Sequence, residues 1–240
     1  MTTIANWRLY SPLKNVFNKS CDYDDDLIDS IRALGEDSWV VQEKAEGTQL
    51  SFFYNNDAYR FCVRPPSYSV SANDLYDLVH TLLNDQLKAK INTLFDSLGA
   101  KEYIAIHGIL IGGNYPHEKV VPIPTSINAS KTLPLSKKIF YGPNNLFYAF
   151  DIEIDGHYLN PQQVIGAFYR TNFLHAPIRM IASFDECIKS DVDFITEIPL
   201  QLGLPPIDKN FSAGIVIRPT NNLYDENQQR IILKKECVLV

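Results

Sequence analysis

The amino-acid sequence predicts an α+β protein in which mainly antiparallel sheets are flanked by helices. Three observations predict this class. Short runs rich in Ile, Val, Tyr and Phe end at Gly or Pro, one long segment has helical spacing, and strand-like runs outnumber helical ones. With 240 residues, of which 45% are hydrophobic, the chain is long enough to bury a sizeable core. No repeat, linker or low-complexity tract divides it, so we expect a single domain over residues 1–240.

The first half of the chain contains three predicted strands and the clearest predicted helix. Residues 39–54 are interpreted as two strands separated by a turn at Glu46-Gly47, where a glycine can adopt positive φ, and residues 58–64 as a third strand. From Asn73 to Leu98, apolar residues recur at three- and four-residue spacing, which predicts a long helix with room for one break and an end at Gly99. The acidic run at 22–26 indicates a solvated loop or a helix start.

The second half contains four more predicted strand segments. Residues 102–113 and 145–159 are rich in Ile, Tyr and Phe, and the second segment is expected to turn as a hairpin at Asp155-Gly156. Residues 161–173 are predicted to be helical. Residues 213–219 and 230–240 are predicted to be strands, joined by a loop that contains Asn221-Asn222.

Charge and composition exclude several classes of protein. The chain has 22 Lys and Arg against 28 Asp and Glu, a net charge of -6, so a generally basic surface for nucleic acid is excluded while a local basic groove is not. The apolar runs are too short for a membrane span and the N-terminus lacks the pattern of a signal peptide, so we expect a cytoplasmic or nuclear protein without a membrane partner. Four scattered cysteines without a CxxC pair predict neither a disulfide framework nor a zinc site.

Lys44 is the first candidate for chemistry. It lies between a β-rich run and a glycine, with Glu43 before it and Glu46 two residues after it. Covalent chemistry at a lysine requires the neutral amine, which burial or a neighbouring cation favours and neighbouring carboxylates oppose. Taken alone, this segment is typical of a surface lysine in solvated ion pairs.

Six segments in one order change that interpretation. They are EKAEGT (43–48), CVRPP with Arg64, HGILIGGNYPH (107–117), FYAFDI (147–152), AGIVIRP (213–219) and IILKKE (231–236). In sequence and spacing they resemble the nucleotidyltransferase motifs of ATP-dependent RNA ligases, in particular the group that includes the second RNA ligase of phage T4 and the trypanosome RNA-editing ligases. The opening YSPLKN (10–15) is also similar, so the resemblance spans nearly the whole chain.

The resemblance implies a nucleotidyltransferase fold of the ATP-grasp-like ligase type, with ATP and Mg²⁺ or Mn²⁺ as cofactors and RNA as partner. In this family the motif lysine attacks the α-phosphate of ATP, carries AMP as a phosphoramidate and passes it to an RNA 5′-phosphate, and a 3′-hydroxyl then displaces it. Lys44 would take that role. The resemblance also implies Glu43 beside the adenine, Arg64 near the ribose and phosphate, Phe150 stacked on the adenine with Asp151 as its acidic neighbour, Lys234 and possibly Lys235 at the α-phosphate, and Glu46 and Gly47 in the same pocket.

These implied roles fit the chemistry. Phosphoryl transfer depends mainly on positioning and on cations that face the transition-state charge, and an aromatic face holds a flat base. Taken separately, Arg64 is more typical of an exposed strand end, Phe150 of a core aromatic residue and Asp151 of a turn residue or hydrogen-bond acceptor.

The family pattern has gaps here. Ile109 stands where a glutamate normally follows the motif glycine, and Ala213 stands where a glutamate normally precedes Gly214. Neither side chain offers an oxygen to Mg²⁺, so we expect turnover to suffer, with Glu46, Asp151 and Glu153 as candidate replacement ligands. Lys234-Lys235-Glu236 stands where some relatives show Lys-x-Lys, and a one-residue shift of the alignment would restore that match.

The sequence therefore predicts an RNA-ligase-like nucleotidyltransferase that forms a lysyl-AMP for joining RNA 5′-phosphate and 3′-hydroxyl ends, as in RNA repair. The alternative is a degenerate pseudo-ligase that binds nucleotide or RNA without ligation. Capping-type guanylyl transfer is a third interpretation, which FYAFDI and GGNYPH disfavour. For RNA we expect a local basic patch of Arg218, Arg230, Lys234 and Lys235. The position of the last motif near residue 240 fits a catalytic-domain fragment, a minimal ligase or a protein that has lost ligation.

Overall fold

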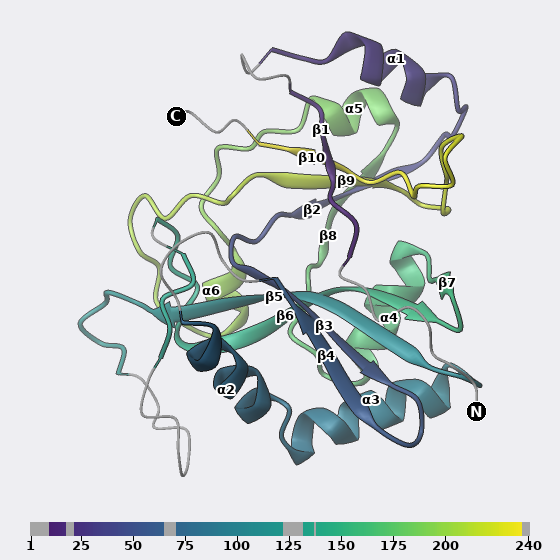
Figure 1. The fold of residues 1–240 in the computed structure, drawn as a ribbon. Helices are drawn as coiled ribbons and strands as arrows, with labels where there is room; N and C mark the ends of the chain where they lie inside the picture. Colours follow the sequence, from purple (N-terminus) through teal and green to yellow (C-terminus); the bar gives the residue numbers. More distant parts are fainter. Residues whose placement is uncertain (1–9, 18–21, 65–70, 122–131, 137, 237–240) are drawn as a thin grey trace.

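Two five-stranded sheets, one above the other in Figure 1, form the framework of the protein. The structure is a computed structural model that describes residues 10–17, 22–64, 71–121, 132–136 and 138–236. The upper sheet contains, in spatial order, β1 (Lys14–Asn15), β10 (Leu233–Lys235), β9 (Ile215–Pro219), β2 (Trp39–Glu43) and β8 (Ile178–Ala182). The lower sheet contains β4 (Tyr59–Val63), β3 (Thr48–Tyr54), β5 (Ile104–Asn114), β6 (Gly142–Ile154) and β7 (His157–Tyr158).

Strand directions confirm the predicted class. Every neighbouring pair in the lower sheet is antiparallel. In the upper sheet only β1 and β10 run parallel, and the remaining pairs are antiparallel.

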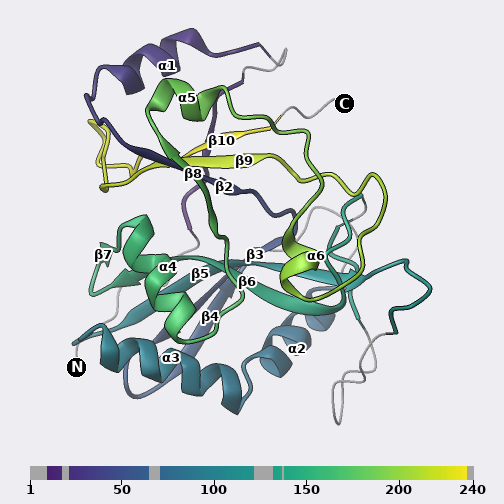
Figure 2. The same ribbon diagram turned by 180° about the vertical axis from the view of Figure 1, so that it is seen from behind.

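Helices cover the outer side of each sheet (Figure 2). α2 (Ala72–Leu82), α3 (Asp85–Ser97) and α4 (Pro161–Arg170) lie against the lower sheet, while α1 (Asp25–Arg32) and α5 (Phe184–Ile188) lie against the upper one. The short α6 (Ile198–Gln201) contributes Ile198 to the contacts between the sheets. Within the described residues, no helix is long and apolar enough to cross a bilayer.

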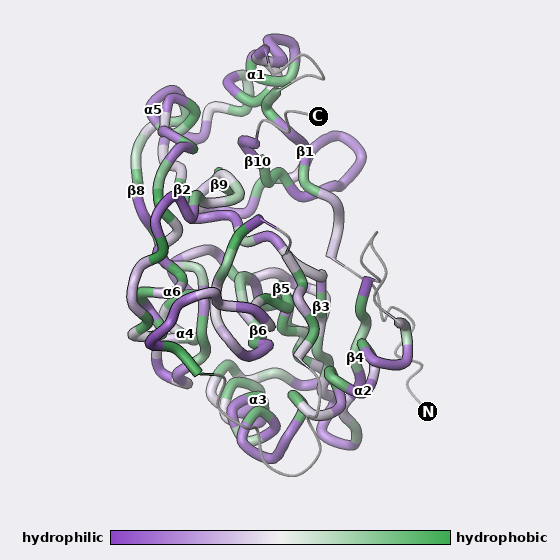
Figure 3. Tube along the Cα trace, turned by 90° about the vertical axis from the view of Figure 1, so that its left-hand side faces the viewer, coloured by the Kyte–Doolittle hydropathy of each residue, from purple (hydrophilic) through white to green (hydrophobic). Residues whose placement is uncertain are grey.

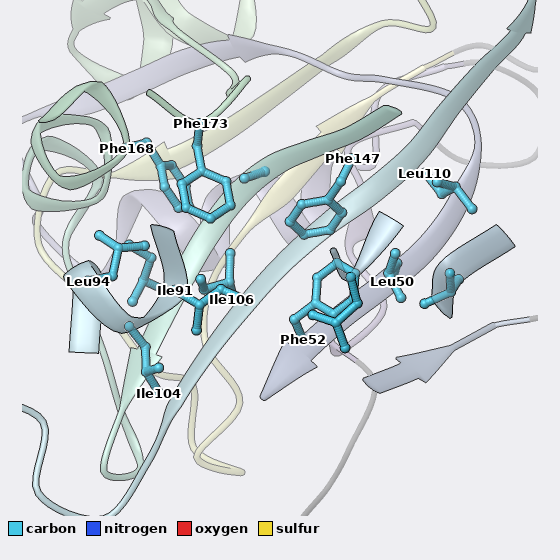
Figure 4. Close-up of a cluster of buried hydrophobic side chains, with 14 of the residues drawn as sticks. Leu50, Phe52, Ile91, Leu94, Ile104, Ile106, Leu110, Phe147, Phe168 and Phe173 are labelled. Carbon is cyan, nitrogen blue, oxygen red and sulfur yellow. The ribbon is translucent and has the colours of Figure 1, made fainter. Parts of the chain in front are cut away.

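Three apolar clusters hold these layers together. The largest lies between the lower sheet and its helices, where Phe52, Ile106, Phe147 and Phe168 pack together (Figure 4). A second joins the upper sheet to α1 and α5, and a third lies between the sheets. Figure 3 shows the same pattern, with largely apolar strands at the centre of the lower sheet and hydrophilic outer loops. Each fully buried Leu, Ile or Phe contributes on the order of 1.5–3 kcal/mol to the transfer free energy of the core.

Several predicted elements are confirmed with their local causes. The helix predicted over residues 73–98 is broken once, because the side chain of Asn84 caps α3 by accepting from the main-chain N of Leu87 at 3.0 Å. It ends before Gly99, which has a φ of 71°. The hairpin between β6 and β7 turns at Asp155 and Gly156, both at positive φ.

The interpretation of residues 39–54 as adjacent strands around a turn is corrected by the sheet topology. β2 and β3 belong to different sheets, so residues 44–47 form a crossover between the sheets. Gly47 is not among the glycines with positive φ. A Cβ atom there would lie 2.2 Å from the carbonyl oxygen of Leu110, so close backbone approach, and not the turn conformation, requires a glycine.

Some elements lacked a usable sequence pattern. The acidic run is a helix start, because Asp24 caps α1 by accepting from the main-chain N of Leu27 at 3.1 Å. β1 and β8 were not predicted. Part of the predicted last strand, residues 237–240, lies outside the described residues.

Candidate active site

A cavity of about 590 Å³ lies between the two sheets. Its walls come from β2, β9 and β10 of the upper sheet, β3, β5 and β6 of the lower sheet, and residues 10–13. The structure brings most of the sequence-predicted residues to this one cavity, namely Glu43, Lys44, Glu46, Gly47, Arg64, Phe150 and Lys234. Ile109, one of the two positions where the resemblance implies a glutamate, also lines it. The described residues that line the cavity do not include Asp151, Glu153, Ala213 or Lys235.

The crossover between the sheets positions Lys44. Its main-chain N donates to the carbonyl oxygen of Gly214 at 3.0 Å, which ties the crossover to the start of β9. Its Nζ lies 2.7 Å from Oε2 of Glu236, and Nζ of Lys234 contacts the other carboxylate oxygen of Glu236. One carboxylate therefore bridges the ammonium groups of two cavity-lining lysines.

The glutamates on either side of Lys44 are both held. The carboxylate of Glu43 accepts from Oγ1 of Thr196 and, at 3.0 Å, from the main-chain N of Glu197. Burial raises the pKa of Glu43, and these hydrogen bonds only partly offset it. The carboxylate of Glu46 accepts from Oγ of Ser136 at 3.0 Å, and Glu46 lines the cavity.

A β-bulge in β6 explains the orientation of the FYAFDI segment. His107 pairs with Asp151 and Gly108 with Ala149, so Phe150 is an extra residue in β6. Side chains on both sides of the bulge pack in the same core cluster: Phe147 and Ala149 before it, and Ile152 and Ile154 after it. Phe150 and Asp151 therefore both point away from that cluster, towards the upper sheet.

Asp151 anchors a buried network behind the cavity wall. It is fully buried, accepts from the hydroxyl of Tyr10 at 2.6 Å, and pairs with Arg230 and, at 3.4 Å, with Arg218. Burial alone would raise its pKa, but the two guanidinium groups and Tyr10 outweigh burial and lower it. The ring of Tyr10 packs edge-on against Phe150 with centroids 4.9 Å apart, so Asp151 orients Phe150 through Tyr10.

Glu153 and Lys235 are also engaged away from the cavity. Glu153 contacts the hydroxyl of Tyr103, and its carboxylate lies 3.8 Å from Nε2 of His107. Burial opposes ionisation, but the nearby His107 and the hydroxyl of Tyr103 lower the pKa of Glu153 to about 2. Lys235 is buried on the opposite side of β10 from Lys234, and its Nζ donates to the carbonyl oxygens of residues 188 and 190 at 2.8 and 2.9 Å.

Two groups of expectations change in consequence. Of the four residues expected in a basic patch, Arg218, Arg230, Lys234 and Lys235, only Lys234 has a side chain more than 10% exposed, and the two arginines pair with Asp151. Of the three candidate metal-binding acids, Glu46 alone lines the cavity. Over the described ranges, no cluster of three or more His, Cys, Asp or Glu residues is suited to hold a metal ion.

Several residues of the cavity were not predicted from the sequence. Thr48, Tyr148 and Arg218 line it. The hydroxyls of Thr48 and Tyr148 and Nε of Arg218 are buried and have no hydrogen-bond partner in the part of the chain that the structure describes. Buried polar atoms without a partner are costly unless a ligand or water satisfies them. Tyr148 lies two residues from Phe150, so strand alternation was a usable pattern for it, whereas nothing near Thr48 or Arg218 indicated an unpaired atom.

Comparison with known proteins identifies the class. The family model for RNA ligases matches residues 37–235. The Naegleria gruberi RNA ligase solved with PPi has a TM-score of 0.54 and 17% identity, over 96% of this chain and 56% of that one. A variant of the same ligase solved with ATP and Mn has a TM-score of 0.56 and 16% identity, over 98% of this chain and 57% of that one. No curated protein matches the sequence.

The chain belongs to the RNA ligase family, and the likeness to these solved structures shows that it has their nucleotidyltransferase fold. It spans a little over half of the length of those solved ligases.

Proposed function

We propose that the cavity between the sheets binds ATP and that Lys44 takes AMP from it as the first step of RNA end joining. The observation that carries this proposal is the cavity itself, which combines Lys44, Arg64 and Phe150 with buried polar atoms that lack partners. A flat base suits the aromatic wall, and triphosphate oxygens suit the cationic wall. The motif series, FYAFDI above all, supports a place near the phage T4 and trypanosome editing ligases.

The chemistry follows from the groups at the wall. The neutral amine of Lys44 forms a bond to the α-phosphorus as the bond to the β-phosphate oxygen breaks. Pyrophosphate leaves, and the nitrogen releases one proton to solvent to give the phosphoramidate. Transfer of the AMP to an RNA 5′-phosphate and its displacement by a 3′-hydroxyl complete the joining. Lys234 and Arg64 supply positive charge near the phosphates.

A divalent cation, Mg²⁺ or Mn²⁺, would enter with the nucleotide. Of the three acids expected to hold the metal, Glu46 lines the cavity, and the described residues contain no group of three possible ligands, so the phosphates and water would provide most of the coordination. When bound, the cation would neutralise phosphate charge. Each carboxylate lost at Ile109 and Ala213 is expected to cost on the order of 3 kcal/mol, about a hundredfold in rate.

A degenerate binding protein is the second candidate function. The observation in its favour is that Ile109 places a hydrocarbon side chain in the cavity where the family has a glutamate. Such a protein would bind ATP or RNA but would release no pyrophosphate.

Labelling with α-labelled ATP separates the two candidates. With Mg²⁺ or Mn²⁺ we expect an adduct of roughly 329 Da, one AMP, that is lost in Lys44→Met. Lys101→Met is the matched control, because Lys101 is exposed on the surface and should label like the unmodified protein. If no label forms with either metal, covalent adenylation is rejected. GTP in place of ATP tests guanylyl transfer, and RNA binding that does not weaken with salt would argue against phosphate contacts.

A further inference from the structure

We propose that Glu236 is an internal competitor of the nucleotide phosphates, because its carboxylate occupies the two ammonium groups of Lys44 and Lys234 that a phosphate would need. The proposal rests on the proposed function, since it assumes that phosphates enter this cavity. It adds a regulator of the same site: a carboxylate that must leave before the anion binds.

The contacts at Glu236 define the competition. Nζ of Lys44 lies 2.7 Å from one carboxylate oxygen, and Nζ of Lys234 contacts the other. The three side chains are 14–28% exposed, so they are neither fully solvated nor sealed in the core. Burial would raise the pKa of Glu236, but Lys44 and Lys234 outweigh burial and lower it, so the carboxylate is charged at neutral pH.

Strand alternation explains why a carboxylate reaches this point. Along the chain from β10, Lys234 lines the cavity and Glu236 lies on the same side, where it contacts Lys44 and Lys234. Lys235 between them is buried on the other side against main-chain carbonyls. A one-residue shift of the alignment would place Lys235 at the family position, but the side chain of Lys235 points away from Lys44 and Lys234. The sequence Lys-Lys-Glu places one cation and one anion at this wall.

The backbone around Glu236 is held on two sides. Asn15 donates from Nδ2 to the carbonyl oxygen of Glu236 at 3.1 Å. On the other side, a Cβ at Gly214 would lie 2.4 Å from the carbonyl oxygen of Lys235 and 3.2 Å from Cβ of Glu236. The carbonyl of Gly214 also accepts from the main-chain N of Lys44. The main chain thus fixes the starting point of the side chain, and only its rotamers can release the carboxylate.

Competition lowers the apparent affinity for phosphate in proportion to the open fraction, which is the fraction of molecules in which the Glu236 carboxylate has left the two ammonium groups. With Glu236 in place the two ammonium groups and one carboxylate carry a net charge of +1, and without it the charge is +2. A phosphate that needs both ammonium groups binds only when the carboxylate has moved away, so its apparent Kd is the intrinsic Kd divided by that open fraction. A closed state favoured about tenfold or more makes the loss about tenfold or more.

Calorimetric titration at fixed ionic strength tests the proposal with three probes: adenosine, inorganic tripolyphosphate and ATP. The variants are Glu236→Gln and Glu236→Ala, with Glu226→Gln as the matched control, because Glu226 is an exposed loop residue. We expect tripolyphosphate and ATP to bind both Glu236 variants at least about tenfold more tightly than the unmodified protein. Adenosine should bind all four proteins equally.

The probes separate the two proposals. Equal or weaker tripolyphosphate binding in a folded Glu236 variant, checked by its thermal melting curve, overturns the competition whatever adenosine does. If adenosine binds none of the four proteins while tripolyphosphate binds the Glu236 variants more tightly, the purine pocket is rejected and the competition is kept. A gain that also appears in Glu226→Gln would be a general charge effect and would overturn the role of Glu236.

Discussion

Substitution Asp151→Asn tests whether the buried network fixes the cavity wall. The change keeps the size of the side chain but removes its charge, which leaves the guanidinium groups of Arg218 and Arg230 buried without a counter-ion. Removing one partner of a buried ion pair typically costs about 3–5 kcal/mol. Arg230 keeps hydrogen bonds to Asn222 and to the carbonyl of Leu159, so we expect the lower end, about 3 kcal/mol.

Urea unfolding at pH 7 measures this loss, and Asp57→Asn is the control because Asp57 is exposed. The pKa of Asp151 is lowered from its ordinary value of 3.8, so its stabilisation is fully present above about pH 3.8 and is lost as pH falls towards the folded-state pKa. The difference between Asp151→Asn and the unmodified protein should therefore shrink below pH 3.8. A loss under about 1 kcal/mol at pH 7, or one that is the same at all pH values, would refute the reasoning.

Three further predictions concern single positions. Gly47→Ala should lower the free energy of unfolding by about 1–3 kcal/mol in denaturant titrations, because the new Cβ would meet the carbonyl oxygen of Leu110; an unchanged midpoint would contradict it. Lys235→Met should destabilise by about 1–3 kcal/mol with unchanged tripolyphosphate affinity, whereas Lys234→Met should weaken that affinity, and calorimetry compares the pair. Because the pKa of Glu153 is about 2, its stabilisation disappears only as pH falls from about 4.5 to 2, and Glu153→Gln should flatten that acid limb in thermal melts.

The sequence patterns predicted those parts of the fold that depend on local periodicity. Apolar spacing located α2 and α3, and positive-φ residues at Asp155 and Gly156 located the hairpin, because each depends on neighbours a few residues away. The crossover at 44–47 was missed, because two apolar runs around a glycine fit a hairpin as well as a change of sheet. β1 has only two residues, and its partner β10 is more than two hundred positions away.

In the candidate site, too, local patterns were predictable and contacts between distant segments were not. Four residues from the ordered motifs, Lys44, Arg64, Phe150 and Lys234, line one cavity. They did not reveal that Asp151 is neutralised by two arginines, because an ion pair between distant segments leaves no local pattern. The opposite directions of Lys234 and Lys235 follow from side-chain alternation in the strand predicted over residues 230–240, although that consequence was not drawn from the sequence.

The extra residue in β6 makes the length of that strand a condition of the site. Before Phe150 the odd-numbered side chains enter the core, and after it the even-numbered ones do. Deleting one residue after the bulge would shift the following side chains by one position, and charged groups such as Glu153 would be driven into hydrocarbon while Ile152 turned outward. A one-residue insertion or deletion, which a surface loop tolerates, should therefore prevent folding when it falls in this part of β6.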